Sequence, residues 1–98
     1  MPLYSRLLRF KKDYKALSRD QKVAFKDSVA EFIDDLATGK FRKGLRVRGV
    51  QGAAGIFEMT WADDGRATFA FGPPVEGHEG ETHIIWRRVG THDIFGAP

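Results

Sequence analysis

The residues best suited to chemistry lie near the end of the sequence, where His92 follows Arg87 and Arg88 within five positions. The imidazole of histidine has an unperturbed pKa of about 6.5, so it gains and loses protons near neutral pH. Arginine presents a planar fork of N–H donors that fits the oxygens of a phosphate. This combination suits acid–base chemistry on a phosphate ester. The alternative is that His92 and Asp93 are solvated turn residues at the end of a strand.

A strand is expected to position these groups. The run from His83 to Val89 has strand length and is rich in β-branched and aromatic residues, and Gly90 breaks it. A rigid strand would thus place His92 just beyond its own end.

Basic residues are concentrated in two segments, although the net charge is only +3. The members of these segments are Arg6, Arg9, Lys11, Lys12 and Lys15, and then Lys40, Arg42, Lys43, Arg46 and Arg48. Such a distribution gives the molecule a positive side, which favours a polyanionic partner. The alternative is that these side chains only keep a small domain in solution.

The length of 98 residues predicts one domain, residues 1–98. The sequence has no cysteine, so disulfides and thiolate zinc sites are excluded, and the three histidines lack the spacing of a metal-binding pair. We therefore expect no metal or other cofactor. No apolar run approaches the ~20 residues that cross a bilayer, so we expect a cytoplasmic location and no membrane partner.

Two helices are predicted in the first part of the chain. Apolar residues recur at steps of four and three in residues 3–17, which favours a helix that ends near Leu17. Residues 3–10 could instead form a short strand before a shorter helix. Ser18 and Gln21 have the spacing of a capping box, so the second helix should start at Arg19 and run to about Thr38.

Strands follow Gly39. Residues 45–50 alternate in character, which predicts a strand with Arg46 and Arg48 on one face. Residues 57–61 and 66–71 are predicted to form a hairpin whose loop has Gly65 in the left-handed conformation. That loop would pair Ala62 with Arg66 and, further along, position 57 with position 71.

These elements predict an α+β fold in which two N-terminal helices pack on one face of a small, mostly antiparallel sheet of three to four strands. The helices should cover the face that carries Phe57, Trp61 and Phe69. The other face should be wet and is a plausible binding surface; it would carry Arg46 or Arg48, Glu58, Thr60, Arg66 and Thr68.

The order of elements resembles the RelE/ParE superfamily of bacterial type II toxins over essentially the whole chain. The spacing from Gly55 through Arg66 to Phe69 is similar to the family's Gly-aromatic strand, its arginine just past the hairpin and a following aromatic residue. The segment 88–95, Arg-Val-Gly-Thr-His-Asp-Ile-Phe, is similar to the end of the YafQ-like branch, where Gly-Thr-His precedes a phenylalanine. A RelE-like fold is the implied fold.

The resemblance implies a ribosome-dependent mRNA endoribonuclease that inhibits translation, with a cognate antitoxin protein, the ribosome and mRNA as partners. By position, Arg66 matches the family's phosphate-binding arginine, His92 its acid/base residue and Phe95 the terminal aromatic that stacks on or orders the substrate. The chain also departs from the family, because Glu58 and Thr60 stand where RelE has lysines and where YafQ-like toxins have histidines nearby. The identity of the general base therefore stays open.

Metal-free cleavage of RNA uses the 2′-hydroxyl group as the nucleophile on the adjacent phosphate. His92 is expected to be the general acid, while Arg66 holds the non-bridging oxygens with help from other arginines, namely Arg46, Arg48 and Arg88. Glu58 is a candidate general base, or it only pairs with an arginine. Phe95 could stack on a base.

Two other functions fit the same sequence. A ParE-like inhibitor of DNA gyrase would act by protein contacts and would tolerate His92→Ala. A catalytically inactive RNA-binding module of the same fold would bind RNA at low salt and would cut nothing.

Overall fold

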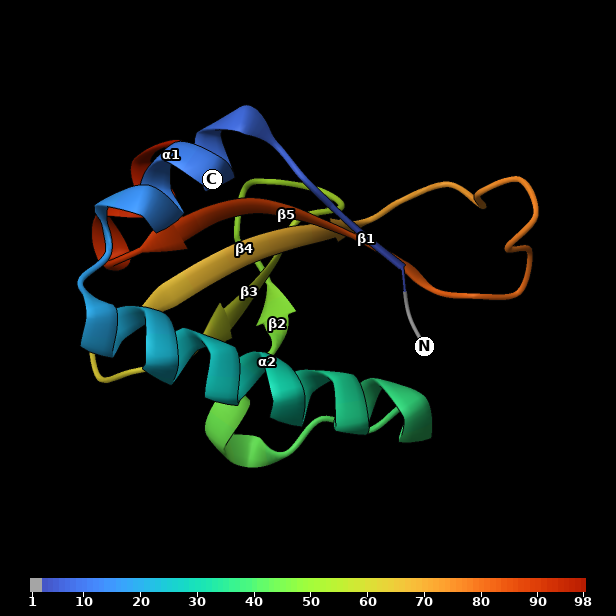
Figure 1. Ribbon diagram of the computed structural model, residues 1–98, viewed down its shortest axis with the longest axis horizontal. Helices are drawn as coiled ribbons and strands as arrows, with labels where there is room; N and C mark the ends of the chain where they lie inside the picture. Colours follow the sequence, from blue (N-terminus) through green and yellow to red (C-terminus); the bar gives the residue numbers. More distant parts are fainter. Residues whose placement is uncertain (1–2) are drawn as a thin grey trace.

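The computed structural model describes residues 3–98 and shows, within them, a five-stranded mixed sheet with two α-helices (Figure 1). The strands are β1 (Leu3–Arg6), β2 (Arg48–Gly49), β3 (Phe57–Thr60), β4 (Arg66–Phe71) and β5 (His83–Gly90). The α-helices are α1 (Leu8–Ala16) and α2 (Arg19–Thr38), and two 3-10 helices are η1 (Lys43–Leu45) and η2 (His92–Gly96). The predicted α+β class is confirmed, with more strands than expected.

The sheet has the order β1-β5-β4-β3-β2, in which β1 runs parallel to β5 and the other neighbours are antiparallel. Residues 3–16 thus form a strand and a short helix, which was the second of the two predictions for this segment. Leu3 pairs with His83 and Arg6 with Trp86. Hydrogen bonds to β5 hold this segment as a strand, and helical periodicity alone does not reveal such a distant partner.

The predicted bounds of α2 are confirmed. The Ser18 hydroxyl accepts a hydrogen bond from the Gln21 backbone N–H (3.1 Å), and the Gln21 side chain accepts one from the Ser18 N–H (2.7 Å). At the other end Gly39 takes a φ of +75°, the left-handed conformation that closes helices. Both signals are local, which explains why they can be read from the sequence.

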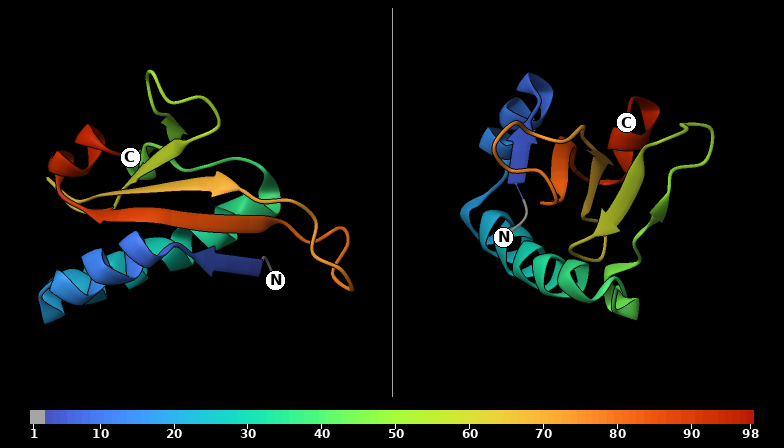
Figure 2. Two further views of the ribbon diagram at one scale, coloured as in Figure 1. Left: turned by 90° about the horizontal axis from the view of Figure 1, so that it is seen from above. Right: turned by 90° about the vertical axis from the view of Figure 1, so that its right-hand side faces the viewer.

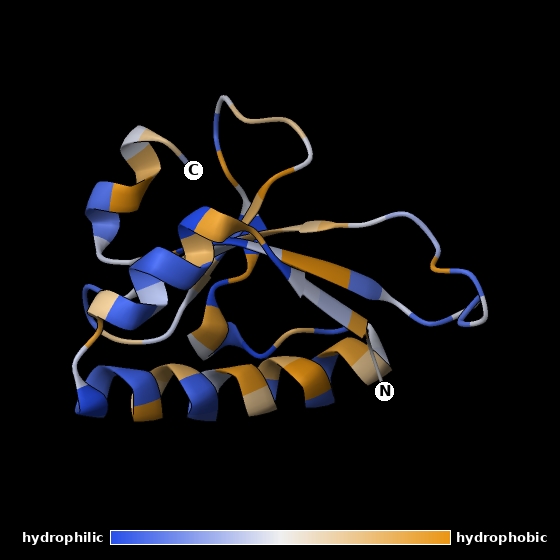
Figure 3. Ribbon diagram, turned by 45° about the horizontal axis from the view of Figure 1, so that its top comes forward, coloured by the Kyte–Doolittle hydropathy of each residue, from blue (hydrophilic) through white to orange (hydrophobic). Residues whose placement is uncertain are grey.

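The core is an aromatic cluster between the helices and the sheet. In the left view of Figure 2, α1 and α2 lie below the sheet and η2 lies above it. Phe25 of α2 lies 5.6 Å from Trp86, and Phe32 lies 5.0 Å from Phe69, between ring centroids. Figure 3 shows hydrophobic and hydrophilic residues alternating along α2. The expectation that the helices cover the Phe57/Trp61/Phe69 face is confirmed.

The register of the β3–β4 hairpin differs from the predicted one by two residues. Thr60 pairs with Arg66 and Phe57 with Phe69, and the Trp61 N–H donates to the Gly65 carbonyl oxygen. Gly65 is not in the left-handed conformation. A glycine is needed there because a Cβ atom would lie 2.6 Å from two atoms of the Trp61 indole ring. A shift of two residues keeps each side chain on its predicted face.

The predicted strand over residues 45–50 is mostly absent. Residues Lys43–Leu45 form η1, and Arg46 has a φ of +47°, so only Arg48 and Gly49 pair with β3. Arg46 and Arg48 therefore do not share a strand face, contrary to the prediction. The buried side chain of Leu45 explains the difference, because it packs into the core cluster from η1.

Strand β5 contains a bulge at Arg87. Thr68 pairs with Arg88 but its neighbour Phe69 pairs with Trp86, so Arg87 is an extra residue. The bulge changes the phase of the strand: Trp86 and Val89 are both buried, while Arg87 and Arg88 between them are both partly exposed. Two consecutive arginines thereby stay out of the core.

Candidate functional site

His92 is the first residue of η2, directly beyond the end of β5. Thr91 caps this short helix, because its hydroxyl oxygen accepts a hydrogen bond from the Asp93 N–H (3.3 Å). On the neighbouring strand Arg66 pairs with Gly90. The structure thus places His92 and Arg66, the two residues most central to the predicted chemistry, at the same end of the sheet.

The side chain of Asp64 orients the imidazole of His92. Nδ1 of His92 lies 2.7 Å from Oδ1 of Asp64, and we assign the proton to Nδ1 because a carboxylate only accepts. The hydrogen bond from His92 lowers the pKa of Asp64 below its ordinary value, and the charges of His92 and Arg66 act in the same direction. The Nε2 atom of His92 is then the nitrogen available to a substrate.

Asp64 was not among the predicted site residues. The available signal was topological: in an antiparallel pair, the residues before β4 lie beside the residues after β5, so the hairpin loop meets the segment that carries His92. Phe95 completes this arrangement from the far side, since its ring packs edge-on against the imidazole with centroids 5.8 Å apart. His92 itself remains well exposed, with 57% of its side-chain surface accessible.

Arg66 is largely buried, and one of its nitrogens is committed to the hairpin. Its Nη1 atom donates to the carbonyl oxygens of Gly65 (2.9 Å), Ala62 (3.2 Å) and Asp63 (3.2 Å). Among residues 3–98, Nε1 of Trp61 is the only buried side-chain nitrogen or oxygen atom that lacks a hydrogen-bond partner. The other nitrogens of Arg66 make no hydrogen bond to the described chain and keep some contact with solvent, although the residue is only 8% exposed.

A hollow of about 550 Å³ lies beside the hairpin, between α2, η1 and the end of β3. It brings together two predicted site residues, Arg46 and Arg66, with Arg42 and Thr60. Within residues 3–98, Arg46 is the only residue other than glycine that has a positive φ. This backbone conformation is strained for a residue with a side chain, and such strain is often found at functional sites. The hollow is suited to an anion that guanidinium groups can bind.

Arg42 is held at the edge of this hollow by acidic residues of α2. Its Nε and Nη2 atoms and its backbone N–H donate to the carboxylate of Asp35, and its Nη1 donates to Glu31. These contacts tie the basic segment after Gly39 to the helix. The predicted positive charge of this surface is therefore smaller than expected, because Asp35 and Glu31 balance the charge of Arg42. Arg46, in contrast, makes no ion pair within residues 3–98.

The face of the sheet opposite the helices carries a row of polar residues across four strands. Backbone pairing aligns Arg48 with Glu58, Glu58 with Thr68, and Thr68 with Arg88. Arg48 Nε donates to Glu58 Oε1 (2.8 Å). This face is not wet as predicted, because Glu58 is 7% exposed and Thr68 is fully buried. η2 contacts β4 and β5, and the Thr68 hydroxyl donates to the main-chain oxygen of Pro98.

Arg88, another predicted substrate-binding residue, is bound to α1. Its Nε and Nη2 atoms donate to the two carboxylate oxygens of Asp13 at 2.6 and 3.1 Å, and the Val89 N–H donates to the same carboxylate (3.2 Å). The hydrogen bonds from Arg88 to Asp13 raise the pKa of the guanidinium further above its ordinary value. Asp13 was not predicted, and no local pattern in the sequence indicates it.

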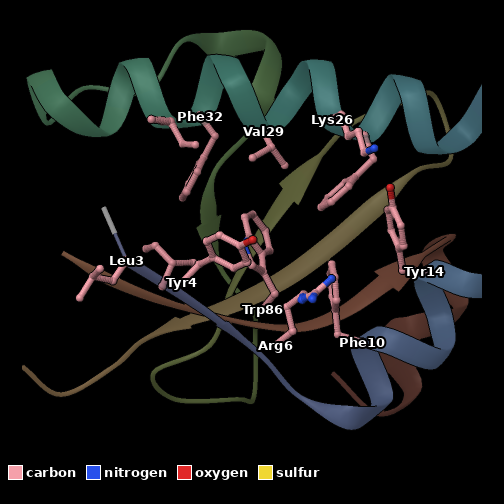
Figure 4. A pocket seen from close by; sticks show the side chains of 12 residues that line it. Leu3, Tyr4, Arg6, Phe10, Tyr14, Lys26, Val29, Phe32 and Trp86 are labelled. Carbon is pink, nitrogen blue, oxygen red and sulfur yellow. The ribbon is translucent and has the colours of Figure 1, made fainter. Parts of the chain in front are cut away.

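A separate apolar cavity of about 260 Å³ opens between α1, α2 and β1 (Figure 4). Its walls are mainly aromatic and aliphatic, with Phe10, Phe25 and Trp86 at its centre and Arg6 and Lys26 as its charged lining residues. Among residues 3–98 we find no group of three or more acidic or histidine side chains that could hold a metal ion. No helix in that range is long and apolar enough to cross a membrane.

No family model matches the sequence, and no curated protein matches it. Solved structures do match the fold. A chain of the E. coli DinJ–YafQ toxin–antitoxin complex has a TM-score of 0.69 at 16% identity, over 94% of this chain and 93% of that one. The YoeB/ParE toxin from Agrobacterium tumefaciens has a TM-score of 0.66 at 13% identity (92% and 98%). A chain of the Methanococcus jannaschii RelB–RelE complex has a TM-score of 0.55 at 16% identity (93% and 91%). At these identities the likeness shows the fold.

Proposed function

We propose that this chain, which has the RelE/ParE toxin fold, is the toxin of a type II toxin–antitoxin pair and a ribosome-dependent mRNA endoribonuclease that inhibits translation. The observation that carries the proposal is the position of His92, which is exposed, oriented by Asp64 and placed at the same sheet end as Arg66. The structural neighbours from toxin–antitoxin complexes support the toxin role.

The proposed reaction needs no metal. A 2′-hydroxyl group attacks the adjacent phosphate, and the bond to the 5′ oxygen breaks. His92 protonates that leaving oxygen from Nε2, because Nδ1 is engaged with Asp64. The hydrogen bond to Asp64 holds the ring in the orientation that presents Nε2. Such a positioned acid contributes about 10²- to 10⁴-fold to a rate.

Arginines stabilise the charge that develops on the phosphate. Arg66 and Arg46 line the same hollow, and their guanidinium groups would bind the non-bridging oxygens; His92 does not line this hollow and would act from beside it. Phe95 orders the imidazole and can also stack on a base. Arg48 and Arg88 are occupied by Glu58 and Asp13, so their part in binding is weaker than that of Arg46.

Glu58 takes the role of general base in this proposal. Its Oε1 atom is held by Arg48 Nε, and a carboxylate oxygen is a group that can accept a proton. If Glu58 serves in this way, Glu58→Gln lowers the cleavage rate by about 10²-fold or more. If Glu58 only holds Arg48, the same substitution lowers the stability of the fold and leaves the rate unchanged.

A second function, that of an RNA-binding module without catalysis, is favoured by one observation. The two groups expected to bind phosphate and to act as base are both partly engaged, Arg66 with the hairpin carbonyls and Glu58 with Arg48. Such a protein would bind RNA through Arg46 and its other basic residues and would cut nothing.

The apolar cavity suits the antitoxin partner. An amphipathic antitoxin segment could place apolar side chains against Phe10 and Trp86 and acidic side chains near Arg6 and Lys26. Val29 lines this cavity, whereas Val23 on the same helix does not and is 54% exposed. An antitoxin should therefore relieve the toxicity of Val23→Asp but not that of Val29→Asp.

The deciding experiment is induced expression of the wild type and of His92→Ala, followed by mapping of mRNA 5′ ends. Cuts within translated codons that vanish in the variant support the endoribonuclease. Growth arrest that persists in His92→Ala without such cuts indicates a gyrase inhibitor. RNA binding without any cuts in the wild type indicates the inactive module.

A further inference from the structure

The residues Ala97 and Pro98 follow η2 and lie against side chains from three other elements. The carbonyl oxygen of Ala97 accepts hydrogen bonds from Arg9 Nη2 (3.0 Å) and Arg88 Nη1 (3.1 Å). The carbonyl oxygen of Pro98 accepts from Arg87 Nε (3.1 Å) and Thr68 Oγ1 (3.3 Å). Four side-chain donors thus converge on two consecutive carbonyl oxygens. We call these four residues, Arg9, Thr68, Arg87 and Arg88, the donor cradle.

The charge of the donor cradle exceeds what its occupant can balance. Its three guanidinium groups are permanently protonated, and within residues 3–98 only that of Arg88 has an acidic partner, Asp13. The carbonyl oxygen of Ala97, which accepts from Arg9 and Arg88, is a neutral group with only partial negative charge. Hydrogen bonds from a guanidinium to an anion are about twice as strong as those between neutral groups. An anionic oxygen is therefore a better ligand for these two arginines than the Ala97 carbonyl.

Two of the four donors are positioned by contacts that do not involve Ala97 or Pro98. Thr68 is fixed in the middle of the sheet between Glu58 and Arg88. Arg88 is held by two hydrogen bonds to Asp13. The bulge at Arg87 keeps two consecutive arginines out of the core. If the two residues moved away, Thr68 and Arg88 would stay in place, while Arg9 and Arg87 would lose their hydrogen bonds to the chain and could turn to a ligand.

We propose that the donor cradle is a phosphodiester-binding subsite for single-stranded RNA, and that residues 97–98 compete with RNA for it. This inference rests on the proposed function, since it concerns a phosphate of the RNA substrate. The competing residues directly follow η2, which carries His92 and Phe95. Their displacement would let the strand continue from the stacking surface of Phe95 onto Thr68 and the arginines, and the covered sheet face would become part of the binding surface.

Binding of RNA that cannot be cleaved tests this subsite separately from catalysis. The probe is a short fluorescent 2′-O-methyl oligoribonucleotide, which lacks the attacking hydroxyl group. The full-length wild type, Arg87→Gln and Arg9→Gln are compared by fluorescence anisotropy over a range of salt concentrations. Arg19→Gln is the matched control, because Arg19 is an exposed arginine in the first turn of α2 and outside the cradle.

We expect each cradle variant to weaken binding about fivefold to tenfold. Each should also reduce the slope of log K against log salt by about 0.7, the value for one phosphate contact on a single strand. If these arginines only fasten residues 97–98, their removal would free the sheet face and leave binding unchanged or stronger. That result would overturn the subsite.

Movement of the competing residues gives a second readout. In methyl NMR spectra, the Ala97 signal should shift towards the position of a flexible chain when the oligonucleotide binds, while that of Ala16 in α1 should not. RNA binding with an unchanged Ala97 signal would overturn the competition and leave the endoribonuclease proposal intact. Absence of oligonucleotide binding by the wild type would also overturn the subsite, whereas the mapping of mRNA ends decides the endoribonuclease by itself.

Discussion

Nδ1 of His92 lies 2.7 Å from Oδ1 of Asp64, although 28 positions separate the two residues in the sequence. The contact exists because β4 and β5 are antiparallel, so the loop before β4 meets the turn after β5. It fixes which nitrogen of the ring faces outward. The same loop contributes Asp63 and Ala62 to the hollow that Arg46 and Arg66 line, so the β3–β4 hairpin connects both parts of the candidate site.

The first prediction concerns the Asp64–His92 pair. Asp64→Asn keeps a side chain of similar shape, but its amide can donate as well as accept, so it no longer fixes the proton of His92 on Nδ1 and the cleavage rate should fall by about tenfold or more. His92→Ala should lose about 10²- to 10⁴-fold. Cleavage by purified ribosome-bound protein measures both. The control is Asp27→Asn, since Asp27 is an exposed residue of α2 and does not line the hollow. Equal rates for Asp64→Asn and the wild type would rule out this role.

The second prediction concerns the ion pair on the sheet face. Arg48→Ala leaves the carboxylate of Glu58, whose side chain is only 10% exposed, without its partner. The expected loss is about 1 to 3 kcal/mol in the free energy of unfolding, and the lower part of this range is favoured because Arg48 itself is 70% exposed. Urea unfolding provides the measurement. Lys40→Ala, which removes an exposed charge without an ion pair in the described chain, should change the stability little.

The third prediction concerns the close contact between Gly65 and Trp61. A Cβ atom at position 65 would lie 2.6 Å from two indole carbons and 2.9 Å from the Cβ of Ala62. Gly65→Ala should therefore destabilise the fold by about 1 to 3 kcal/mol, the usual cost of overpacking. Gly44→Ala is the control, because a Cβ atom at position 44 would have no other atom within 4 Å. The backbone at Gly44 also does not have a positive φ, so an alanine fits it without strain. Similar unfolding midpoints for the two variants would contradict the packing argument.

The fourth prediction concerns pH. The hydrogen bonds from Arg42 lower the pKa of Asp35 below its ordinary value of 3.8. Because the folded pKa is the lower one, the stabilisation is complete above the unfolded pKa and is lost as the pH falls through the folded value. The difference in melting temperature between the wild type and Asp35→Asn should thus be constant near neutral pH and shrink below about pH 4. Circular dichroism measures it, with Asp34→Asn as the control; a difference that does not change with pH would refute the assignment.

The parts of the fold that could be predicted from the sequence are those with local causes. The bounds of α2 follow from Ser18, Gln21 and Gly39, each of which acts within a few residues. The faces of β3 and β4 follow from alternation. The hairpin register could not be predicted, because it is set by the packing of Gly65 against the Trp61 ring rather than by the turn residues alone.

For the candidate site too, the sequence predicts some features and not others. Its location at the end of β5 follows from the run of residues that ends at Gly90. The side chains that hold it, Asp64 for His92 and Asp13 for Arg88, come from distant parts of the chain. Their identity depends on the strand order and on where α1 lies beside β5, which no spacing in the sequence encodes.

The extra residue in β5 is not needed for the buried face of this strand. Without the bulge but with the same residues, strict alternation would turn the Arg88 guanidinium towards the core and Val89 away from it. Deleting one of the two arginines would instead leave a single residue between Trp86 and Val89, and both apolar side chains would stay buried. A natural relative or an engineered version of this protein could therefore lack one of these arginines and keep a regular strand here.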